Sequence, residues 1–215
     1  MKYVLIGVWI FSAPAITDAA EALPTEGAAH REILVRTNKA HGIPGSILIP
    51  AMGVATRVLA QAGVSVRWGK TADSDAPVPV GGCRDRHLSV MDIAFLPKAP
   101  AMVPPSAMAH AFPFASGGVR IQVFWGSILD MHPASRPELQ RSLLGHVLAH
   151  EIAHVLIGTK EHSAWGLMKA KWTFAEEGSM QLRPLPMSVT DMEAMRQNLD
   201  AELQPCPAVV MAARR

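Results

Sequence analysis

This sequence of 215 residues has neither an excess of one charge nor a repeat of fixed period. Its 20 Lys and Arg residues nearly balance its 18 Asp and Glu residues, so that the formal net charge is +2. Because no long basic run is present either, electrostatics give no reason to expect nucleic acid as a partner. The hydrophobic content of 49% is typical of a folded globular protein rather than a disordered one.

The apolar run near the N-terminus, residues 3–13, is too short for a membrane-spanning helix, which needs roughly 20 residues. It follows a positive residue, Lys2, and small residues follow it at Ala13-Pro14-Ala15 and Ala19-Ala20. This pattern predicts a secretory signal peptide over residues 1–20, with an uncleaved anchor or a buried strand as the alternative. We therefore expect a secreted or periplasmic protein that does not contact the membrane once the signal is removed.

Cysteine is scarce, with Cys83 and Cys206 as the two examples. In an exported chain an even number of cysteines predicts one disulfide, which here would tie the C-terminal segment to the middle of the domain. Two separate buried thiols are the alternative. Neither cysteine belongs to a CxxC pair, so we expect a structural role for both.

Segments rich in Pro and Gly separate the predicted helices and strands. Strands are predicted near residues 33–38, 64–68, 88–96 and 119–125, with loops over 70–86, 97–118 and 158–186. The spacing of apolar residues predicts three helices, which run from Pro50 to Gly63, from Pro137 to Ile157, and onwards from a cap at Ser188 or Thr190. This order predicts an α+β domain, in which one mixed sheet packs against helices. We assign this domain to residues 31–205, between a flexible lead at 21–30 and a tail at 206–215.

The most informative stretch lies in the long predicted helix and reads His150-Glu151-Ile152-Ala153-His154. Side chains four residues apart leave the same face of a helix, so both imidazoles can bind one zinc ion. Glu151 projects beside them, where it can act as general base towards a water molecule that the zinc makes acidic. Such a motif also occurs by chance on exposed helices. Here the apolar residues around it predict a buried helix, in which histidine and glutamate need partners.

The longer stretch from His150 to Met168, HEIAHVLIGTKEHSAWGLM, resembles the metzincin family of zinc metallopeptidases. It contains HExxH, a glycine turn, a third histidine and a methionine, in the order of that family. The His162-Ser163 and Leu167-Met168 pairs are similar to those of the matrixins within the family. The upstream segment Ala109–Pro113, with Gly117-Gly118 behind it, is also similar to a matrixin segment.

The resemblance implies a zincin-like fold, with a mixed β-sheet packed against a long active-site helix and a small C-terminal helical subdomain. It also implies a zinc-dependent endopeptidase that acts on peptides or proteins. The implied metal ligands are His150, His154 and His162, and the implied general base is Glu151. The strand that ends at Val123-Phe124-Trp125 is the implied edge of the sheet, to which an extended peptide would add. Nothing in the sequence indicates an oligomeric state.

The spacing departs from the metzincin pattern HExxHxxGxxH. Gly158 comes one residue late and His162 two residues late, so the segment after His154 has two more residues to accommodate. Met168 lies nearer to His162 than in matrixins, and an ordinary core methionine is the alternative to a methionine turn under the metal. Residues 119–122 replace an acid and a histidine that bind metal in matrixins, which argues against further zinc or calcium sites.

Several alternatives stay open at this point. Glu176 or Glu177 would be the third ligand if the chain were a gluzincin with a helix over residues 172–177. His146, one turn before the motif, is more typical of a hydrogen-bonded core histidine, and His110 is either near the site or without a role. A zinc hydrolase of non-peptide amides or esters, or a catalytically silent binding protein with a zinc-stapled helix, is the alternative function.

Overall fold

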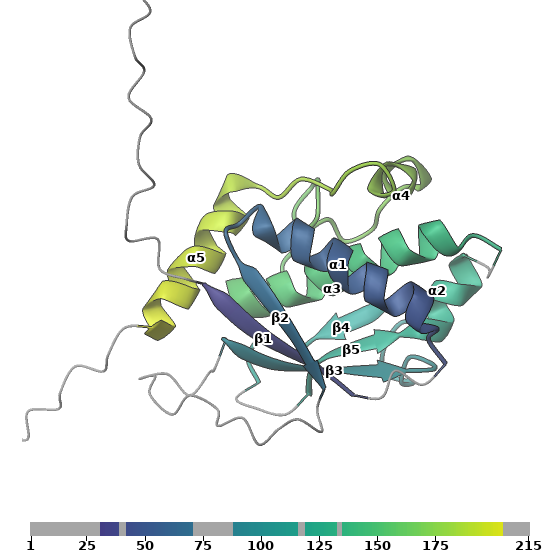
Figure 1. Cartoon of the computed structure of the whole chain (residues 1–215), viewed down its shortest axis with the longest axis horizontal. Coiled ribbons are helices and arrows are strands. Elements are labelled where there is room, and N and C mark those ends of the chain that lie inside the picture. Colours follow the sequence, from purple (N-terminus) through teal and green to yellow (C-terminus); the bar gives the residue numbers. More distant parts are fainter. Residues whose placement is uncertain (1–30, 39–41, 71–87, 116–118, 133–134, 204–215) are drawn as a thin grey trace, which may run out of the picture.

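The computed structural model of the chain describes residues 31–38, 42–70, 88–115, 119–132 and 135–203 (Figure 1). The predicted signal peptide, the flexible lead, the C-terminal tail and both cysteines lie outside these residues. Export and the disulfide therefore remain predictions. None of the described helices is long and apolar enough to cross a membrane.

A five-stranded mixed sheet forms one layer of the domain, in the order β2-β1-β3-β5-β4 (Figure 1). Four of its strands run parallel: β1 (Glu32–Thr37), β2 (Ser65–Lys70), β3 (Val90–Leu96) and β5 (Val119–Phe124). The fifth, β4 (Ala109–Ala111), runs antiparallel to β5 and forms one edge of the sheet. The mixed sheet of the sequence-based prediction is therefore present.

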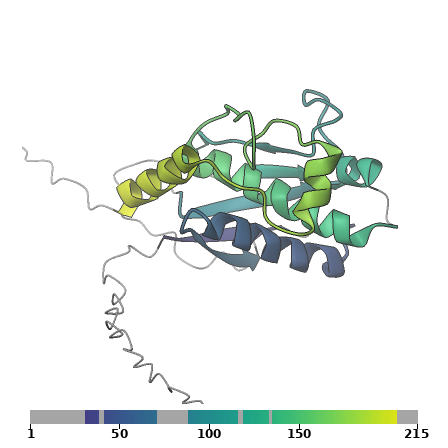
Figure 2. The same cartoon turned by 90° about the horizontal axis from the view of Figure 1, so that it is seen from above.

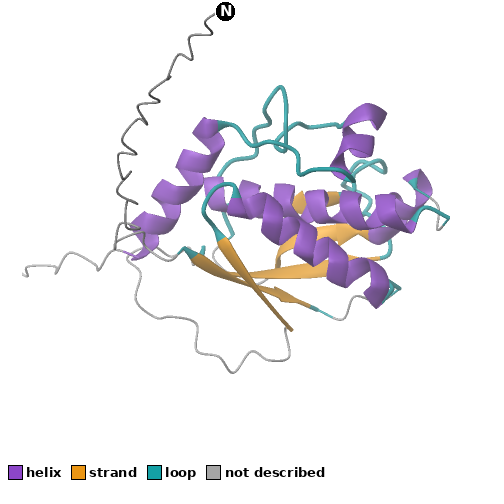
Figure 3. Cartoon of the chain, turned by 45° about the horizontal axis from the view of Figure 1, so that its top comes forward, coloured by secondary structure: helices purple, strands orange, loops and turns teal. Residues whose placement is uncertain are grey.

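Two helices, α1 (Gly45–Ala60) and α3 (Pro137–Ile157), lie side by side on one face of this sheet (Figure 3). Every residue of α3 from Ser142 to Leu156 is buried, because the sheet, α1 and the C-terminal helix α5 (Val189–Leu203) all pack against it. The two shorter helices are α2 (Trp125–Met131) and α4 (Phe174–Met180). Figures 1 and 2 show α5 and α4 at opposite ends of α3.

The last helix, α5, closes the carboxyl end of α3. Asn198 donates from Nδ2 to the carbonyl oxygens of Leu156 and Ile157, both at 2.9 Å, which α3 cannot satisfy by itself. Ser188 caps α5, since its Oγ accepts a hydrogen bond from the N–H of Asp191 at 3.0 Å. This contact selects Ser188 from the two predicted caps.

The first helix begins at Gly45, five residues before the predicted start at Pro50. A proline inside a helix lacks the N–H that would bond to the carbonyl four residues earlier, here that of Ser46. Arg141 of α3 replaces this donor, since its Nε lies 2.9 Å from the Ser46 oxygen. The long helix, by contrast, has the predicted bounds, Pro137–Ile157.

Three short elements differ from the sequence-based prediction. β4 lies in the predicted loop 97–118 and α4 in the predicted loop 158–186. α2 begins at Trp125, where the sequence predicts the end of the last strand. A strand of three residues and helices of seven residues are too short for apolar periodicity to reveal them.

The predicted edge strand is wrong. β5, which ends in Val123 and Phe124, lies inside the sheet between β3 and β4. The edge is Ala109-His110-Ala111 instead, because this short segment folds back on β5 with His110 opposite Gln122. Any extended chain that adds to this side of the sheet would therefore pair with β4.

Helices α1 and α3 come into close contact at Gly145. A β-carbon on this residue would lie 2.4 Å from Cβ of Val54 and 2.7 Å from the carbonyl oxygen of Ala51. Because one of these atoms belongs to the backbone, a rotamer change cannot make room for it. The position of α3 against α1 therefore depends on glycine at this point.

We expect Gly145→Ala to destabilise the protein by about 1–3 kcal/mol, since overpacking at the helix contact outweighs the higher helix propensity of alanine. The free energy of unfolding in urea measures this effect. Gly53→Ala on α1 is the matched control, because a β-carbon there meets only the Arg57 side chain, at 3.6 Å. That control should be neutral or stabilising. Equal effects of the two changes would contradict the steric explanation.

Candidate metal centre

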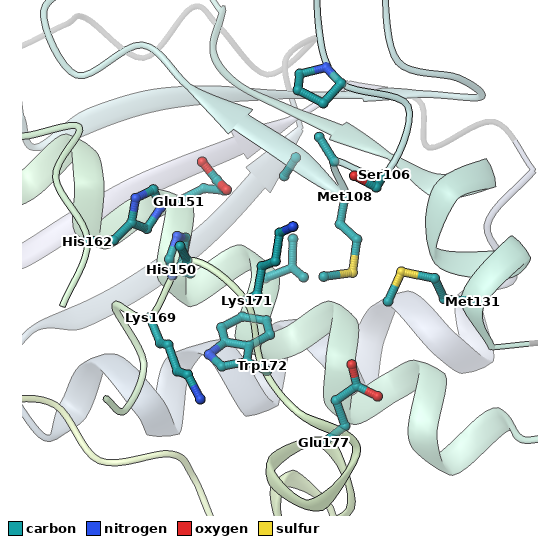
Figure 4. A pocket seen from close by; sticks show the side chains of 15 residues that line it. Ser106, Met108, Met131, His150, Glu151, His162, Lys169, Lys171, Trp172 and Glu177 are labelled. Carbon is teal, nitrogen blue, oxygen red and sulfur yellow. The ribbon is translucent and has the colours of Figure 1, made fainter. Parts of the chain in front are cut away.

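Three histidines converge beside the edge of the sheet. His150 and His154 lie one turn apart on α3 and are 7% and 5% exposed, whereas His162 comes from the following loop and is exposed. Each offers one ring nitrogen, and these three atoms lie within 4.8 Å of one another. The rings of His150 and His162 are stacked, and His154 stands nearly perpendicular to both. Figure 4 shows His150 and His162 on one side of a cavity.

Hydrogen bonds to backbone carbonyls fix the tautomer of the two helical histidines. Nδ1 of His150 lies 2.7 Å from the oxygen of Leu167, and Nδ1 of His154 lies 3.0 Å from the oxygen of Thr159. A carbonyl oxygen only accepts, so each Nδ1 carries the proton and each Nε2 is left with a lone pair. The two Nε2 atoms face each other at 3.0 Å.

Two lone pairs at this distance repel unless a cation lies near both. A proton does not serve at neutral pH, because burial, reinforced by the neighbouring histidines, lowers the pKa of His150 to about 3 and that of His154 to about 4. A zinc ion with nitrogen ligands at about 2.0–2.1 Å places them roughly 3.4 Å apart in a tetrahedron. Neutral imidazoles that donate from their other nitrogen to carbonyls are typical zinc ligands. The donor set therefore fits zinc.

The turn after α3 accommodates the two additional residues before His162. Gly158 ends the helix in the left-handed conformation, with φ 72°, as predicted. The N–H groups of Gly158 and Thr159 both donate to the carbonyl of His154, at 3.0 and 3.2 Å. Thr159 then makes a further turn, in which its Oγ1 accepts from the N–H of Glu161 at 3.0 Å. The longer loop thus still brings His162 to the other two histidines.

The turn Gly166-Leu167-Met168 supports His150 from the opposite side. Its Leu167 carbonyl accepts the hydrogen bond of His150, and the Leu167 N–H donates to the carbonyl of Pro186 at 2.9 Å. Gly166 has φ 72°, and a β-carbon on it would lie 2.3 Å from the same carbonyl oxygen. Met168 is 1% exposed and belongs to the main hydrophobic core, as an ordinary core methionine would.

Glu151 lies next to His150 on α3 and is 8% exposed. Burial raises the pKa of this carboxyl to about 8, although a hydrogen bond from the backbone of Ala111 acts in the opposite direction. That bond joins the predicted general base to strand β4. Figure 4 shows the Glu151 side chain close to His150 and His162.

The outer edge of β4 presents backbone groups to the site. The N–H of Phe112 donates to Arg120, and that of Phe124 donates to Met108, both at 2.8 Å. Residues 108, 110 and 112 therefore turn their backbone groups towards β5, and Ala109 and Ala111 turn theirs outwards. Ala109 thus directs its N–H and its carbonyl away from β5, and the outward N–H of Ala111 binds Glu151.

A cavity of about 490 Å³ adjoins the histidines and Glu151. Apolar side chains from four parts of the chain line it: Met108, Met131, Val147 and Trp172. Trp172 is fixed by a hydrogen bond from Nε1 to the carbonyl of Gly166 at 3.2 Å, and its ring meets His150 edge-on at 5.5 Å. The cavity therefore has a rigid wall directly beside one predicted metal ligand.

Glu177 of α4 lines the same cavity, away from His162 (Figure 4). Its side chain is 6% exposed, and Oε2 lies 3.2 Å from Nε2 of His132, which is also 6% exposed. The two atoms lie within ion-pair distance but do not have hydrogen-bond geometry, and neither has a hydrogen-bond partner among the described residues. Burial raises the pKa of Glu177, while His132 acts in the opposite direction.

Two further candidates from the sequence have other roles. His146 is fully buried, with Nδ1 2.8 Å from the carbonyl of Ser142, and its Nε2 accepts from the N–H of Leu185 at 3.0 Å. It is therefore a core histidine. Glu176 accepts two hydrogen bonds from Nζ of Lys169, at 2.8 and 2.9 Å, and caps α4. Neither Glu176 nor Glu177 joins the three-histidine cluster.

His110 is near the site but does not belong to the cluster of three histidines. It lies on β4 with its ring edge-on to Phe112 at 4.7 Å. It lines a smaller cavity of about 150 Å³ together with Glu151, His154 and His162. Glu151, Ala109 and His162 thus border both cavities.

The sequence reasoning missed the role of the segment that carries Trp172 and Glu177. One signal for it was present. Thr173 and Glu176 have the spacing of a capping box, and the structure forms that box at the start of α4. It would have placed Glu177 on a helix, although no pattern in the sequence indicates the cavity beside it.

The fold is similar to that of archaemetzincin from Methanopyrus kandleri, with a TM-score of 0.50 and 16% sequence identity. The match covers 82% of this chain and 99% of that one. The chain therefore has a zincin-like fold, as the sequence resemblance implied. No known protein-family profile matches the sequence, and no curated protein matches it either. The likeness to matrixins in particular remains a prediction.

We expect His162→Ala to weaken zinc binding by about 100-fold or more, because two imidazoles alone do not complete the site. Competition with a chromophoric chelator measures the affinity, and elemental analysis gives the zinc content per chain. Since His162 is exposed, the variant should fold. His110→Ala is the matched control and should keep its zinc. If His162→Ala bound zinc like the parent, His162 would not be a ligand.

Proposed function

We propose that this chain is an exported zinc-dependent endopeptidase. His150, His154 and His162 would hold the metal, and Glu151 would be the general base. One arrangement carries the proposal: a buried glutamate lies between a histidine cluster that fits zinc and the open edge of β4. The likeness in fold to archaemetzincin supports it.

The edge strand is suited to an extended peptide. Ala109 presents its N–H and carbonyl outwards, and a peptide that adds to β4 would bond to them as a further strand. Antiparallel addition continues the pairing of β4 with β5. A peptide bound in this way passes directly in front of Glu151, because the N–H of Ala111 also binds that carboxyl.

Glu151 has the surroundings that a proton carrier needs. A zinc ion held by the histidines would polarise the scissile carbonyl and make a water molecule acidic near neutral pH. Glu151 accepts the proton of the attacking water and then gives it to the leaving amine. Burial raises the pKa of Glu151, which favours a proton on this carboxyl between the two transfers, whereas a zinc ion beside it would lower the pKa and so leave the carboxylate free to accept the proton first. The hydrogen bond from Ala111 fixes the Glu151 carboxyl relative to β4, the strand that would orient the substrate.

Two alternatives use fewer of these features. A binding protein with a structural zinc would not need a glutamate beside the ligands. A hydrolase of small amides or esters would need Glu151 but not the outward groups of Ala109. The combination of both features favours peptide hydrolysis.

We expect Glu151→Gln to lower kcat/KM for peptide cleavage by about 10²–10⁴-fold while zinc stays bound, because the amide cannot accept the proton. A denatured protein serves as substrate, and mass spectrometry of the new termini detects cleavage at any sequence. Treatment of the parent with a zinc chelator should abolish the same products. Zinc-loaded parent without any cleavage would reject the proposed activity, and equal cleavage by both proteins would reject the mechanism.

We expect Ala109→Pro to lower the turnover of extended peptides by about tenfold or more, because proline removes an outward N–H that the substrate needs. Prolines are tolerated on edge strands, so the bonds between β4 and β5 should persist. Ala109→Ser keeps the N–H and is the control. Zinc content should be the same in both variants. Peptide turnover that is unaffected in a folded Ala109→Pro variant would show that substrates do not pair with β4.

A further inference from the structure

The two cavities lie at different positions along β4, the strand to which the proposed substrate would add. Met108, directly before β4, lines the larger cavity, Ala111 and Pro113 line the smaller one, and Ala109 borders both. An antiparallel peptide runs in the opposite direction, so its N-terminal half passes the smaller cavity and its C-terminal half the larger. In the binding mode proposed above, the cavity of about 490 Å³ would therefore face the side chain just beyond the bond to be cleaved.

This cavity combines apolar walls with one buried acid. Met108, Met131, Val147 and Trp172 supply the walls, and the Glu177 side chain lies beyond them, at the side away from His162 (Figure 4). A long aliphatic stem can pack along such walls while a polar head reaches the carboxylate. A substrate side chain that is apolar throughout would fill the cavity but would offer the buried Glu177 carboxylate no charged or hydrogen-bonding partner.

The negative charge of Glu177 is not compensated by the lysines near the cavity. Lys169 is engaged by Glu176, and no ion pair joins Glu177 to Lys171 among the described residues. The partner of Glu177 among the described residues is His132, whose Nε2 lies 3.2 Å from Oε2, within ion-pair distance, and counteracts the rise in the pKa of the carboxyl, although the pair does not meet the geometry of a hydrogen bond. A buried carboxylate gains most from a cation that also donates hydrogen bonds in line, which is what a guanidinium or ammonium group does.

We propose that Glu177 makes the enzyme select substrates with arginine or lysine directly after the scissile bond. This inference rests on the peptidase function proposed above and adds its substrate class. Glu177 lies at the cavity rather than beside the histidines, so it sets specificity and takes no part in proton transfer.

Matched peptides test the selectivity. A cleavage site found in the denatured substrate is resynthesised with arginine, lysine, citrulline, norleucine or glutamate after the scissile bond. Citrulline has the shape of arginine without the charge. We expect kcat/KM to be at least about tenfold higher for arginine than for citrulline, since charge-assisted hydrogen bonds are roughly twice as strong as neutral ones. Equal rates for arginine and citrulline in the parent would overturn the proposal.

Glu177→Gln should remove the preference for arginine and lysine, so that the ratio of kcat/KM between the arginine and norleucine peptides falls by at least about tenfold. Glu193→Gln is the matched control, because it removes the same charge at an exposed position of α5, outside the cavity, and leaves the ion pair of Lys169 with Glu176 in place. This control should keep the preference. An equal loss for all peptides in Glu177→Gln would mean that the residue acts on stability or chemistry, against the proposal. If that variant does not fold, the arginine and citrulline comparison in the parent decides alone.

A binding measurement separates this inference from the proposed activity. Calorimetry compares n-butylguanidinium with its neutral counterpart n-butylurea on the zinc-loaded parent, Glu177→Gln and Glu193→Gln. We expect n-butylguanidinium to bind the parent and Glu193→Gln at least about tenfold more tightly than it binds Glu177→Gln. Such binding without cleavage of any peptide would reject the peptidase and keep the acidic cavity. Cleavage without charge preference, and without this binding, would keep the peptidase and reject the role of Glu177.

Discussion

Two unprotonated imidazole nitrogens, on His150 and His154, face each other at 3.0 Å. Neither ring can turn its N–H into the gap, because Leu167 and Thr159 hold the two Nδ1 protons with their carbonyls. Those carbonyls belong to the turn that carries Gly166 and to the loop that leads to His162. The segments after α3 therefore do two things at once: they set the tautomers and they bring the third histidine into place.

This contact is possible only because α3 is rigidly buried. Charge on the histidines is unfavourable at neutral pH since burial lowers their pKa values, which keeps their lone pairs available for a metal. The helix gains its burial from the close approach of α1 at Gly145 and from α5, where Asn198 satisfies the last carbonyls. Packing of α3 against α1 and α5 thus helps to keep His150 and His154 buried and uncharged, so that their Nε2 atoms can bind a metal.

The long helix and its motif could be predicted from the sequence because the information is local. Pro137 and Gly158 mark its two ends, and the spacing of His150 and His154 fixes which face they share. The edge strand could not be predicted in this way, because Ala109-His110-Ala111 becomes a strand only by pairing with β5. Nor could the cavity, whose walls come from segments that lie far apart in the chain and meet through packing on α3. The resemblance to the metzincin family indicated the residues of the site. The strand and the cavity around them form only through tertiary contacts, which the sequence does not reveal.

Glu151 and Glu177 show how one property can serve two purposes. Burial raises the pKa of both carboxyls, and each has one neighbour that acts the other way: the Ala111 backbone for Glu151 and His132 for Glu177. A buried carboxylate with one such neighbour is stabilised further by a cation that comes close to it, since solvent screens the attraction little. For Glu151 the nearby positive charge would be the metal of the histidine cluster, which favours proton transfer. For Glu177 the positive charge would belong to a substrate side chain. Burial makes the charge of Glu177 unfavourable in the empty cavity, and for the same reason a cationic side chain would bind there more tightly than a neutral one.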